Sequence, residues 1–503
     1  GLSKYIQANE RFALFQHRVG VKNSLSDDIV YSLYEDRQAN VWVGTMDGGL
    51  NLLDMDSSTV TVYENNPSDS ASLGSNDVRA VYEDQEGTLW VGTYGAGLNR
   101  FDRATGRFTR FQHNLQDERS LSDDRVMAIY EDRRGNLWVG TRAGGLNLVT
   151  NRQTGQFIHF INNPEDSASL SGDFVRTIFE DSRGKLWVGT YNGISVFDLD
   201  TKRFTRYQND PLDPLSLSND RVLSFYESED GIMWVGTLLG GLNRFDPVTQ
   251  AFKHYTEKQG LPNDVVYGIL GDEQGNLWLS TNMGLSRFNP RDETFHNYDI
   301  RDGLQSNEFN AGAYFQRSSR RLYFGGVQGI TVFNPLEVVD NPIVPPVVIT
   351  AFKKFNQVEQ TDLANGEEIQ LSYQDNFISF EFAALDFSNP EKNQYAYRLE
   401  GFSDEWVFTG NQRNASFTNL KGGDYVFRVK GSNKDGVWNE SGAAIKIVVV
   451  PPLWERWWFI GSLALLLIGT VAGGYLLRIR RIQYDQRQLE NQVRERTQEI
   501  ERR

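Results

Sequence analysis

Histidine is the residue type best suited to acid–base or metal chemistry near neutral pH, and this sequence holds five of them. No two are closer than 42 residues, so no pair has the short spacing of a metal-binding motif. Each falls near the end of a recurring sequence unit, in the segment expected to form its outermost strand. They are His17, His113, His159, His254 and His296. We therefore expect surface or inter-strand polar residues, with no catalytic residue and no metal site.

A carboxylate or amide recurs at one position of the same unit, where the innermost strand is expected to begin. The residues are Asp28, Asn76, Asp124, Asp173, Asp220 and Asp264, with Glu308 near this position in the seventh unit. A ring of carboxylates could hold a cation or a cationic ligand. Asp and Asn at the start of a strand more often accept hydrogen bonds from a turn, and we favour this structural interpretation.

The turn between the second and third segments of each unit keeps its glycines but changes its other residues. Positions that every unit needs for packing repeat, whereas turns without that constraint can diverge toward a ligand. Tyr and Arg in these turns could stack on, and hydrogen-bond to, a sugar or an anionic ligand. The candidate ligand-binding residues are Asp47, Tyr94, Arg142, Tyr191 and Asn192. The alternative is that these residues belong to surface turns that have drifted without a ligand.

Composition limits the classes of protein to consider. The chain has 503 residues, a formal charge of −15, 13% aromatic residues and no cysteine. The missing cysteine excludes disulfide scaffolds, thiolate metal sites and iron–sulfur clusters. The acidity disfavours nucleic-acid binding, and the length allows about two to four domains.

The elements that position the candidate residues come from an internal repeat. The string LWVGT, or a close variant, occurs seven times at intervals of 44 to 49 residues, with Trp42 in the first copy and Tyr323 replacing Trp in the last. Each unit contains four short β-branched or aromatic runs separated by Gly, Asn and Asp. Four strands per unit and seven units predict a seven-bladed β-propeller over residues 1–335. The repeating Trp is expected to pack between neighbouring blades.

The two ends of the repeat array are predicted to meet. Residues 1–17 align with residues 97–113, so the chain begins in the third strand of a unit, and with neither an initiator Met nor a signal peptide it resembles a cropped sequence. The last unit ends after Pro335 without a clear fourth strand. A strand around Phe12 to Phe15 would fill that place and close the ring; the alternative is that further blades lie upstream.

The sequence after the propeller changes character. Residues 336–348 are rich in proline and predict a stiff linker. Residues 349–450 lose the LWVGT period but keep alternating apolar segments and turn signals, which predicts a smaller β-sandwich of the immunoglobulin or fibronectin type. The fold class is therefore all-β, with Trp406 and Trp438 in the second domain.

A membrane-spanning helix is predicted over residues 459–477, a run of 19 residues without a charge. The aromatic segment 451–458 precedes the run, as expected at a membrane interface, and Arg478, Arg480 and Arg481 follow it. Since positive residues stay in the cytoplasm, we expect a single-pass protein of a bacterial inner membrane, with the propeller and sandwich in the periplasm and the C-terminus in the cytoplasm. The alternative, a buried core helix, is disfavoured by these flanks.

The last segment, residues 478–503, has apolar residues at the spacing of a coiled coil. Ile482, Leu489, Val493 and Ile500 step by 7, 4 and 7 residues. Gln486 and Arg496 occupy the other seam positions and weaken the pattern. We expect a parallel homodimer through this segment; the alternative is a single solvated helix.

These motifs together resemble a known family. Units reading NLWVGT followed by GGLN resemble two-component-regulator propeller repeats. The sandwich, with YAYRLEGFSDEW from Tyr395 to Trp406, resembles the triple-tyrosine domain that follows such propellers. The segment from Leu489 to Arg503 resembles the linker helix ahead of a cytoplasmic histidine kinase or GGDEF cyclase. Many relatives carry about twice as many blades, and no kinase or cyclase motif follows the membrane segment here.

The resemblance implies the sensor portion of a single-pass membrane receptor, most directly of a sensor histidine kinase whose catalytic domain follows Arg503. It implies no enzyme activity in this chain and no cofactor; an unidentified small molecule or oligosaccharide is the implied ligand. The alternatives are the sensor of a transmembrane diguanylate cyclase, an extracellular propeller lyase, and a membrane-anchored scaffold that does not signal. A lyase would want a histidine near the propeller axis, which the positions of the histidines disfavour.

Overall fold

The computed structural model describes residues 11–54, 59–316 and 320–502. It divides into two compact units, Gly1–Val339 and Asp340–Arg503. The third strand predicted at the start of the chain, within residues 1–10, lies outside the described residues.

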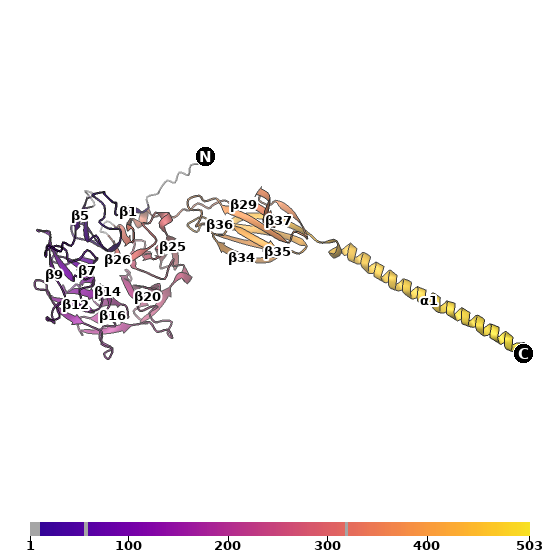
Figure 1. Ribbon diagram of the computed structural model, residues 1–503, viewed down its shortest axis with the longest axis horizontal. Coiled ribbons are helices and arrows are strands. Elements are labelled where there is room, and N and C mark those ends of the chain that lie inside the picture. Colours follow the sequence, from indigo (N-terminus) through magenta and orange to yellow (C-terminus); the bar gives the residue numbers. More distant parts are fainter. Residues whose placement is uncertain (1–10, 55–58, 317–319, 503) are drawn as a thin grey trace. The chain divides into compact units, whose positions relative to one another are not determined.

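The first unit is a ring of seven four-stranded antiparallel sheets, the predicted β-propeller (Figure 1). The innermost strands are β2 (Val30–Glu35), β6 (Val78–Glu83), β10 (Val126–Glu131), β14 (Val175–Glu180), β18 (Val222–Glu227), β22 (Gly268–Gly271) and β26 (Phe309–Gln316). The second strands carry the repeated aromatic residue and are β3 (Val41–Thr45), β7 (Leu89–Thr93), β11 (Leu137–Thr141), β15 (Leu186–Thr190), β19 (Met233–Thr237), β23 (Leu277–Thr281) and β27 (Leu322–Gly326). Each inner strand contacts the inner strands of both neighbouring blades, so the sheets surround one axis.

The outer half of each blade follows the same order. The third strands are β4 (Leu50–Asp54), β8 (Leu98–Asp102), β12 (Leu146–Asn151), β16 (Gly193–Asp198), β20 (Leu242–Asp246), β24 (Gly284–Asn289) and β28 (Gly329–Phe333). The outermost strands are β5 (Thr59–Tyr63), β9 (Arg107–Phe111), β13 (Gln156–Phe160), β17 (Arg203–Tyr207), β21 (Ala251–Tyr255), β25 (Thr294–Tyr298) and, in the seventh blade, β1 (Ala13–Phe15). β1 pairs antiparallel with β28, so the predicted closure of the ring by an N-terminal strand is confirmed.

Hydrogen bonds between blades recur all the way around the ring. In each blade a glycine at the start of the third strand, or just before it, donates its N–H to the carbonyl of the Asp or Asn that precedes the next inner strand, at 2.7–3.0 Å. The pairs are Gly49 to Asn76, Gly97 to Asp124, Gly145 to Asp173, Gly193 to Asp220, Gly241 to Asp264, Gly284 to Asn307 and Gly329 to Asp28. The last pair joins the seventh blade to the first, so the ring is closed by the bond that joins every other pair of blades.

The repeated tryptophan packs as predicted. Trp42 is 1% exposed, and its ring meets Phe101 of the next blade edge-on, with centroids 5.5 Å apart. Its indole N–H donates to Asp36 in the turn after the inner strand, at 2.8 Å. The same bond joins Trp90 to Asp84, Trp138 to Asp132, Trp187 to Asp181 and Trp278 to Asp272. Trp therefore fills six of the seven inter-blade cores, with Tyr323 in the other, and in five blades it also anchors a turn through an aspartate.

The propeller unit ends slightly later than predicted. A 3-10 turn, η3 (Pro335–Glu337), follows β28, and Val338 packs with Phe333 in the core of the last blade. Two further 3-10 turns, η1 (Glu257–Gln259) and η2 (Ile300–Asp302), replace the longer connections into the sixth and seventh blades. Both are closed by a capping box and a left-handed glycine.

The second unit contains the predicted β-sandwich. One sheet has the order β30 (Gln357–Leu363), β29 (Val347–Lys354), β32 (Phe377–Ala384) and β35 (Asn414–Thr418). The other has the order β31 (Glu368–Ser372), β37 (Trp438–Val450), β36 (Gly423–Ser432), β33 (Tyr395–Glu400) and β34 (Ser403–Gly410). Phe380 and Phe427, both 0% exposed, stack between the sheets with ring centroids 4.4 Å apart. The first strand of the sandwich, β29, begins at Val347, inside the segment 336–348 that was predicted as a linker.

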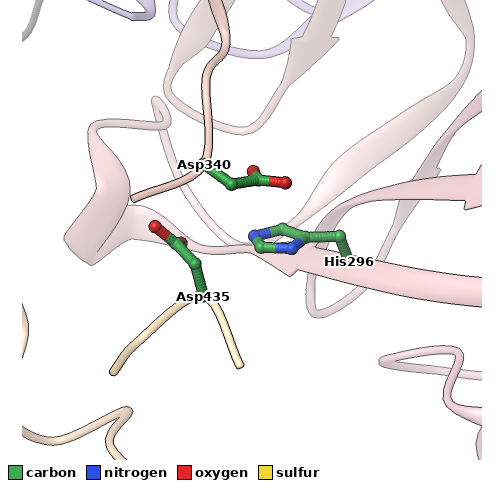
Figure 2. A group of neighbouring side chains, drawn as sticks. All are labelled: His296, Asp340 and Asp435. Atoms are coloured by element: carbon green, nitrogen blue, oxygen red, sulfur yellow. The ribbon is translucent and has the colours of Figure 1, made fainter. Parts of the chain in front are cut away.

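Two loops of this unit are tied together beside the sandwich. The Asp435 carboxylate accepts the backbone N–H of Asn341 at 2.7 Å, and the Asn433 side chain donates to the Asn341 carbonyl at 2.7 Å. Figure 2 draws Asp435 with Asp340, the first residue of this unit. The start of the unit is thus held by the loop between β36 and β37.

A single long helix ends the described chain. After β37, Pro451 and Pro452 lead into a 3-10 turn, η4 (Leu453–Glu455), and then α1 (Trp457–Glu501). Trp457 and Trp458, predicted to precede the membrane helix, form its first turn. α1 is long and apolar enough to cross a membrane, and none of its apolar window is buried. The segments predicted separately as 459–477 and 478–503 are therefore continuous.

Candidate ligand-binding face

The predicted ligand residues lie in the turns between the second and third strands, beside the beginnings of the inner strands. The backbone N–H groups of Tyr94, Arg142 and Tyr191 donate to carbonyls just before the inner strand of their own blade, at 2.8–3.2 Å. These three turns are therefore fixed at the same end of the inner strands. We call this side of the propeller the candidate face.

Three of the five predicted residues belong to one cluster. The Arg142 guanidinium donates to the Tyr94 hydroxyl and lies 5.5 Å from the centre of that ring. Arg142 also lies 5.7 Å from the Phe174 ring, which stacks on Tyr191 with centroids 4.0 Å apart. Phe174 precedes the inner strand of the fourth blade and connects the two predicted positions.

The other two predicted residues are not part of this cluster. Asp47 is exposed, and its backbone N–H donates to Asp27 at 3.1 Å. Asn192 is exposed, and its carbonyl accepts the Gln208 side chain at 3.0 Å. Within the described ranges, no contact joins either side chain to Tyr94, Arg142 or Tyr191.

A set of residues that the sequence did not single out lines the axis next to these turns. They are the second residues of the inner strands: Tyr31, Arg79, Met127, Arg176, Leu223 and, in the last two blades, Tyr267 just before β22 and Asn310 in β26. Arg79 lies 3.6 Å from the centre of the Tyr31 ring and 5.1 Å from that of Tyr94. A signal was available, because this position changes from unit to unit while an apolar residue, usually Val, always precedes it.

The charges of the face differ from those of the whole chain. Arg79 pairs with Asp77 at 2.5 Å, and Arg125 pairs with Asp123 at 2.9 Å. Arg142, Arg176 and Arg221 form no ion pair with any carboxylate in the described part of the chain, and Arg221 lies 5.9 Å from the Tyr191 ring. Burial lowers the pKa of Arg176. A group of unpaired guanidinium groups therefore stands at one end of the axis in an acidic protein.

The recurring carboxylates have the structural role that we favoured. Each accepts, at 2.6–3.0 Å, a backbone N–H from the connection after the preceding outermost strand. The acceptors are Asp28, Asn76, Asp124, Asp173, Asp220, Asp264 and Asn307. The seventh position is therefore Asn307 and not Glu308, because the shorter η2 connection donates to the residue before Glu308.

The histidines lie at the edges of the blades. His159, His254 and His296 are in outermost strands, as predicted, whereas His17 and His113 follow theirs. Ring nitrogens of His159 and His254 lie 2.7 Å from the carbonyls of Ser120 and Ser216. His296, drawn in Figure 2, packs beside Tyr298 with ring centroids 4.7 Å apart.

A cavity of about 400 Å³ opens between the fifth and sixth blades, at the opposite end of the inner strands from the candidate face. In the second and third blades an arginine after the third strand bridges two blades: Arg103 pairs with Asp36, and Arg152 with Asp84, of the preceding blade. In the sixth blade Pro290 holds the corresponding position, and Ser228 replaces the aspartate that receives the indole N–H. Leu199 and Pro247 hold the arginine position in the fourth and fifth blades, but the aspartate that they face is kept there. The cavity lies at the blade boundary where both the arginine and the aspartate are replaced.

With this geometry established, comparison with known proteins assigns the two units. The model of the two component regulator propeller family matches six blades, at residues 24–47, 72–95, 120–143, 169–192, 216–238 and 260–283. The Y_Y_Y domain model matches residues 386–450, in the sandwich. The chain carries two component regulator propeller repeats followed by a Y_Y_Y domain.

The chain is similar to several bacterial proteins. Over 223 residues the chain is 35% identical to histidine kinase P4 of Formosa agariphila. The aligned region covers 42% of this chain and 16% of that protein. It is also similar to the extracellular domain of BT3049 of B. thetaiotaomicron, which has been assigned to the hybrid two component systems (TM-score 0.72, 28% identity, 88% of this chain and 58% of that one).

A second solved relative is the extracellular domain of BT4673 from the same organism, assigned to the same class (TM-score 0.50, 25% identity, 84% of this chain and 57% of that one). The propeller and Y_Y_Y chain therefore spans less than two thirds of each of these proteins. Its fold is that of the extracellular part of such sensors, and its apolar helix follows that part at the C-terminal end.

Proposed function

We propose that this chain is the extracytoplasmic ligand-sensing and transmembrane signalling portion of a single-pass receptor in a bacterial inner membrane. One observation carries the proposal: the repeats, the Y_Y_Y domain and an apolar helix follow one another in a single chain whose solved relatives are extracellular domains. A ligand that binds one of two conformations more tightly would shift the population of a cytoplasmic output.

The output that we propose is a histidine kinase. The similarity to histidine kinase P4 supports it over the diguanylate cyclase that the linker helix alone would also fit. The extracellular lyase is disfavoured because the histidines lie at the blade edges, where His159 and His254 contact backbone carbonyls. The propeller and sandwich would be periplasmic, because Arg478, Arg480 and Arg481 follow the apolar part of α1.

Dimerisation through residues 478–503 is the second part of the proposal. Ile482, Leu489, Val493 and Ile500 are between 49% and 76% exposed in the single chain. They keep the spacing of a coiled-coil seam on a continuous helix, so a second copy would cover them. Such a paired helix could carry a change in the receptor to two output domains.

The absence of cysteine allows a direct test of the topology. Val248→Cys lies on an 88% exposed propeller position, and Glu499→Cys lies at the end of α1. In spheroplasts a membrane-impermeant maleimide should label Val248→Cys and should reach Glu499→Cys only after lysis. The cysteine-free chain is the control for background labelling. The opposite pattern, or equal labelling of both variants in intact spheroplasts, would refute the proposed orientation.

The same approach tests the dimer. Val493→Cys lies on the predicted seam, and Glu495→Cys lies two residues along the helix, on another face. Mild oxidation of membranes should cross-link Val493→Cys far more than Glu495→Cys. Equal cross-linking of both variants would indicate random collision, and no cross-linking of Val493→Cys would argue against a parallel seam.

A further inference from the structure

Arg176 is a buried guanidinium at the axis of the propeller. It is 8% exposed, and it donates to the carbonyls of Met127, at 3.3 Å, and of Ala311. The seventh inner strand is shaped to receive it: β26 carries a wide bulge between Phe309 and Tyr314, and Gly312 within the bulge has φ +83°. A Cβ at Gly312 would lie 2.9 Å from an Arg176 nitrogen. The side chain of the fourth blade thus reaches the backbone of the seventh.

The charge of Arg176 is not balanced inside the protein. Its hydrogen-bond partners are two neutral carbonyls, and it forms no ion pair with a carboxylate within residues 11–54, 59–316 and 320–502. Taking an unpaired charge out of water is unfavourable, so proteins usually place a counter-charge beside it. Burial lowers the pKa of Arg176, which agrees with a poorly solvated site. A ligand anion would supply the missing charge.

Aromatic rings and guanidinium groups alternate around Arg176. The sequence along the face is Tyr31, Arg79, Tyr94, Arg142, Phe174, Tyr191 and Arg221, each within 6 Å of the next. We call this set the arginine–aromatic arc. Arg176 lies beside the arc, close enough to Tyr191, Tyr31 and Arg79 for these groups to influence its pKa. Aromatic faces suit the apolar faces of sugar rings, and arginine forks suit carboxylate and sulfate groups.

We infer that the candidate face binds an acidic saccharide. Its carboxylate or sulfate groups would contact Arg142, Arg176 and Arg221, and a sugar ring would pack against the arc at Phe174 and Tyr191. The acidic residues nearby do not oppose this: Asp77 and Asp123 are paired with Arg79 and Arg125. Asp27 and Asp47 in the first blade, and Glu308 beside Tyr267, are further acidic residues of this face. This inference deepens the proposed ligand-sensing function and rests on it.

The binding experiment uses matched probes that differ in charge. Calorimetry on the full chain in detergent would compare tetragalacturonate with its methyl ester, and a heparin tetrasaccharide with its desulfated form, with sodium sulfate as the free anion. We expect at least one acidic tetrasaccharide to bind, and its neutral counterpart to bind at least about tenfold more weakly. Arg142→Gln and Arg221→Gln should each weaken binding roughly 5- to 20-fold, and Arg176→Gln more strongly. Arg107→Gln, on an exposed outer strand, should leave it unchanged.

Several outcomes would overturn the inference. These are equal binding of the acidic and neutral forms, sulfate alone binding as tightly as the tetrasaccharide, or no acidic probe binding to the wild-type chain. If Arg176→Gln fails to fold, the exposed double variant Arg142→Gln with Arg221→Gln decides, and wild-type affinity in it refutes the site. A neutral saccharide whose binding is lost in Tyr94→Ala would refute the anionic class and keep the sensor function. The cysteine-labelling result stands apart from all of these.

Discussion

Replacing Arg152 with methionine should destabilise the propeller substantially. Arg152 is 20% exposed and joins Asp84 of the second blade, at 2.7 Å, to Glu131 of the third. The side chains of those carboxylates are 0% and 2% exposed, so the variant leaves two buried charges without their cation. Breaking a buried pair costs about 3–5 kcal/mol. Asp84 keeps the indole N–H of Trp90 and two backbone N–H donors, so we expect roughly 2–4 kcal/mol.

The corresponding change in melting temperature is modest because the unit is large. An unfolding entropy of about 2.1 cal/mol/K per residue, over about 330 residues, makes 1 kcal/mol equal to roughly 1.4 °C, so the midpoint should fall by roughly 3–6 °C. Tryptophan fluorescence follows this transition, since Trp90 bonds directly to Asp84. Arg107→Met is the matched control, because its pair with Asp69 is 59% and 44% exposed and contributes less than about 1 kcal/mol.

A compensated variant separates lost charge from lost packing. Adding Asp84→Asn and Glu131→Gln to Arg152→Met removes the unpaired charges and should restore part of the lost midpoint. A midpoint in Arg152→Met equal to that of Arg107→Met would refute the view that buried ionic bridges hold adjacent blades together. A compensated variant no more stable than Arg152→Met alone would refute the electrostatic part of the argument.

Two further predictions concern the turns. Gly97→Ala should lower the melting midpoint more than Gly106→Ala. The two glycines have nearly the same backbone angle, with φ of +71° at Gly97 and +70° at Gly106. A Cβ at Gly97 would lie 2.3 Å from a backbone oxygen, whereas a Cβ at Gly106 would lie 3.9 Å from the nearest atom, a ring carbon. The free energy of unfolding of the two variants should differ by about 1–3 kcal/mol, and equal melting midpoints would contradict this prediction. Burial alone raises the pKa of Asp36, but hydrogen bonds from Trp42, Arg103 and Asn40 outweigh burial and hold the pKa below its ordinary value. Asp36 therefore stabilises the fold above the unfolded pKa of about 3.9 and loses this effect as pH falls through the lower folded value. Melting curves between pH 5 and 2.5 should fall more steeply for wild type than for Asp36→Asn, and parallel curves would contradict this.

Most of the propeller could be predicted from the sequence because its stabilising contacts repeat. Trp42 and its counterparts must fill the same gap and reach the same Asp in nearly every blade, so the sequence shows a visible period. The N-terminal strand could be assigned to the seventh blade by counting strands. The continuity of α1 could not be predicted in the same way. The change from apolar to charged residues after Leu477 marks where a helix would leave the membrane, but it does not show whether the helix ends there.

The candidate face was only partly predictable. Turn residues such as Tyr94 and Arg142 stood out because they vary between fixed glycines. Arg176 did not stand out, because a single arginine within an apolar strand does not show from the sequence that its side chain reaches across the propeller axis. Its partners, Met127 and Ala311, are 49 and 135 residues away in the chain. Their proximity depends on ring closure and on the bulge of β26, which appear only when the blades are assembled.

The division between repeated and variable positions also separates stability from recognition. The hydrogen bond from Gly97 to Asp124 has a counterpart in every blade, and the bond from Trp90 to Asp84 has one in four others, so substitutions at these positions should change folding. The second residue of each inner strand contributes little to those contacts and faces the axis, where the proposed ligand would meet several blades together. Arg176 departs from this division because it lies at a variable position and yet joins two distant blades. A ligand anion on Arg176 would therefore act on the contact between the fourth and seventh blades, which gives ligand binding a route to the structure of the ring.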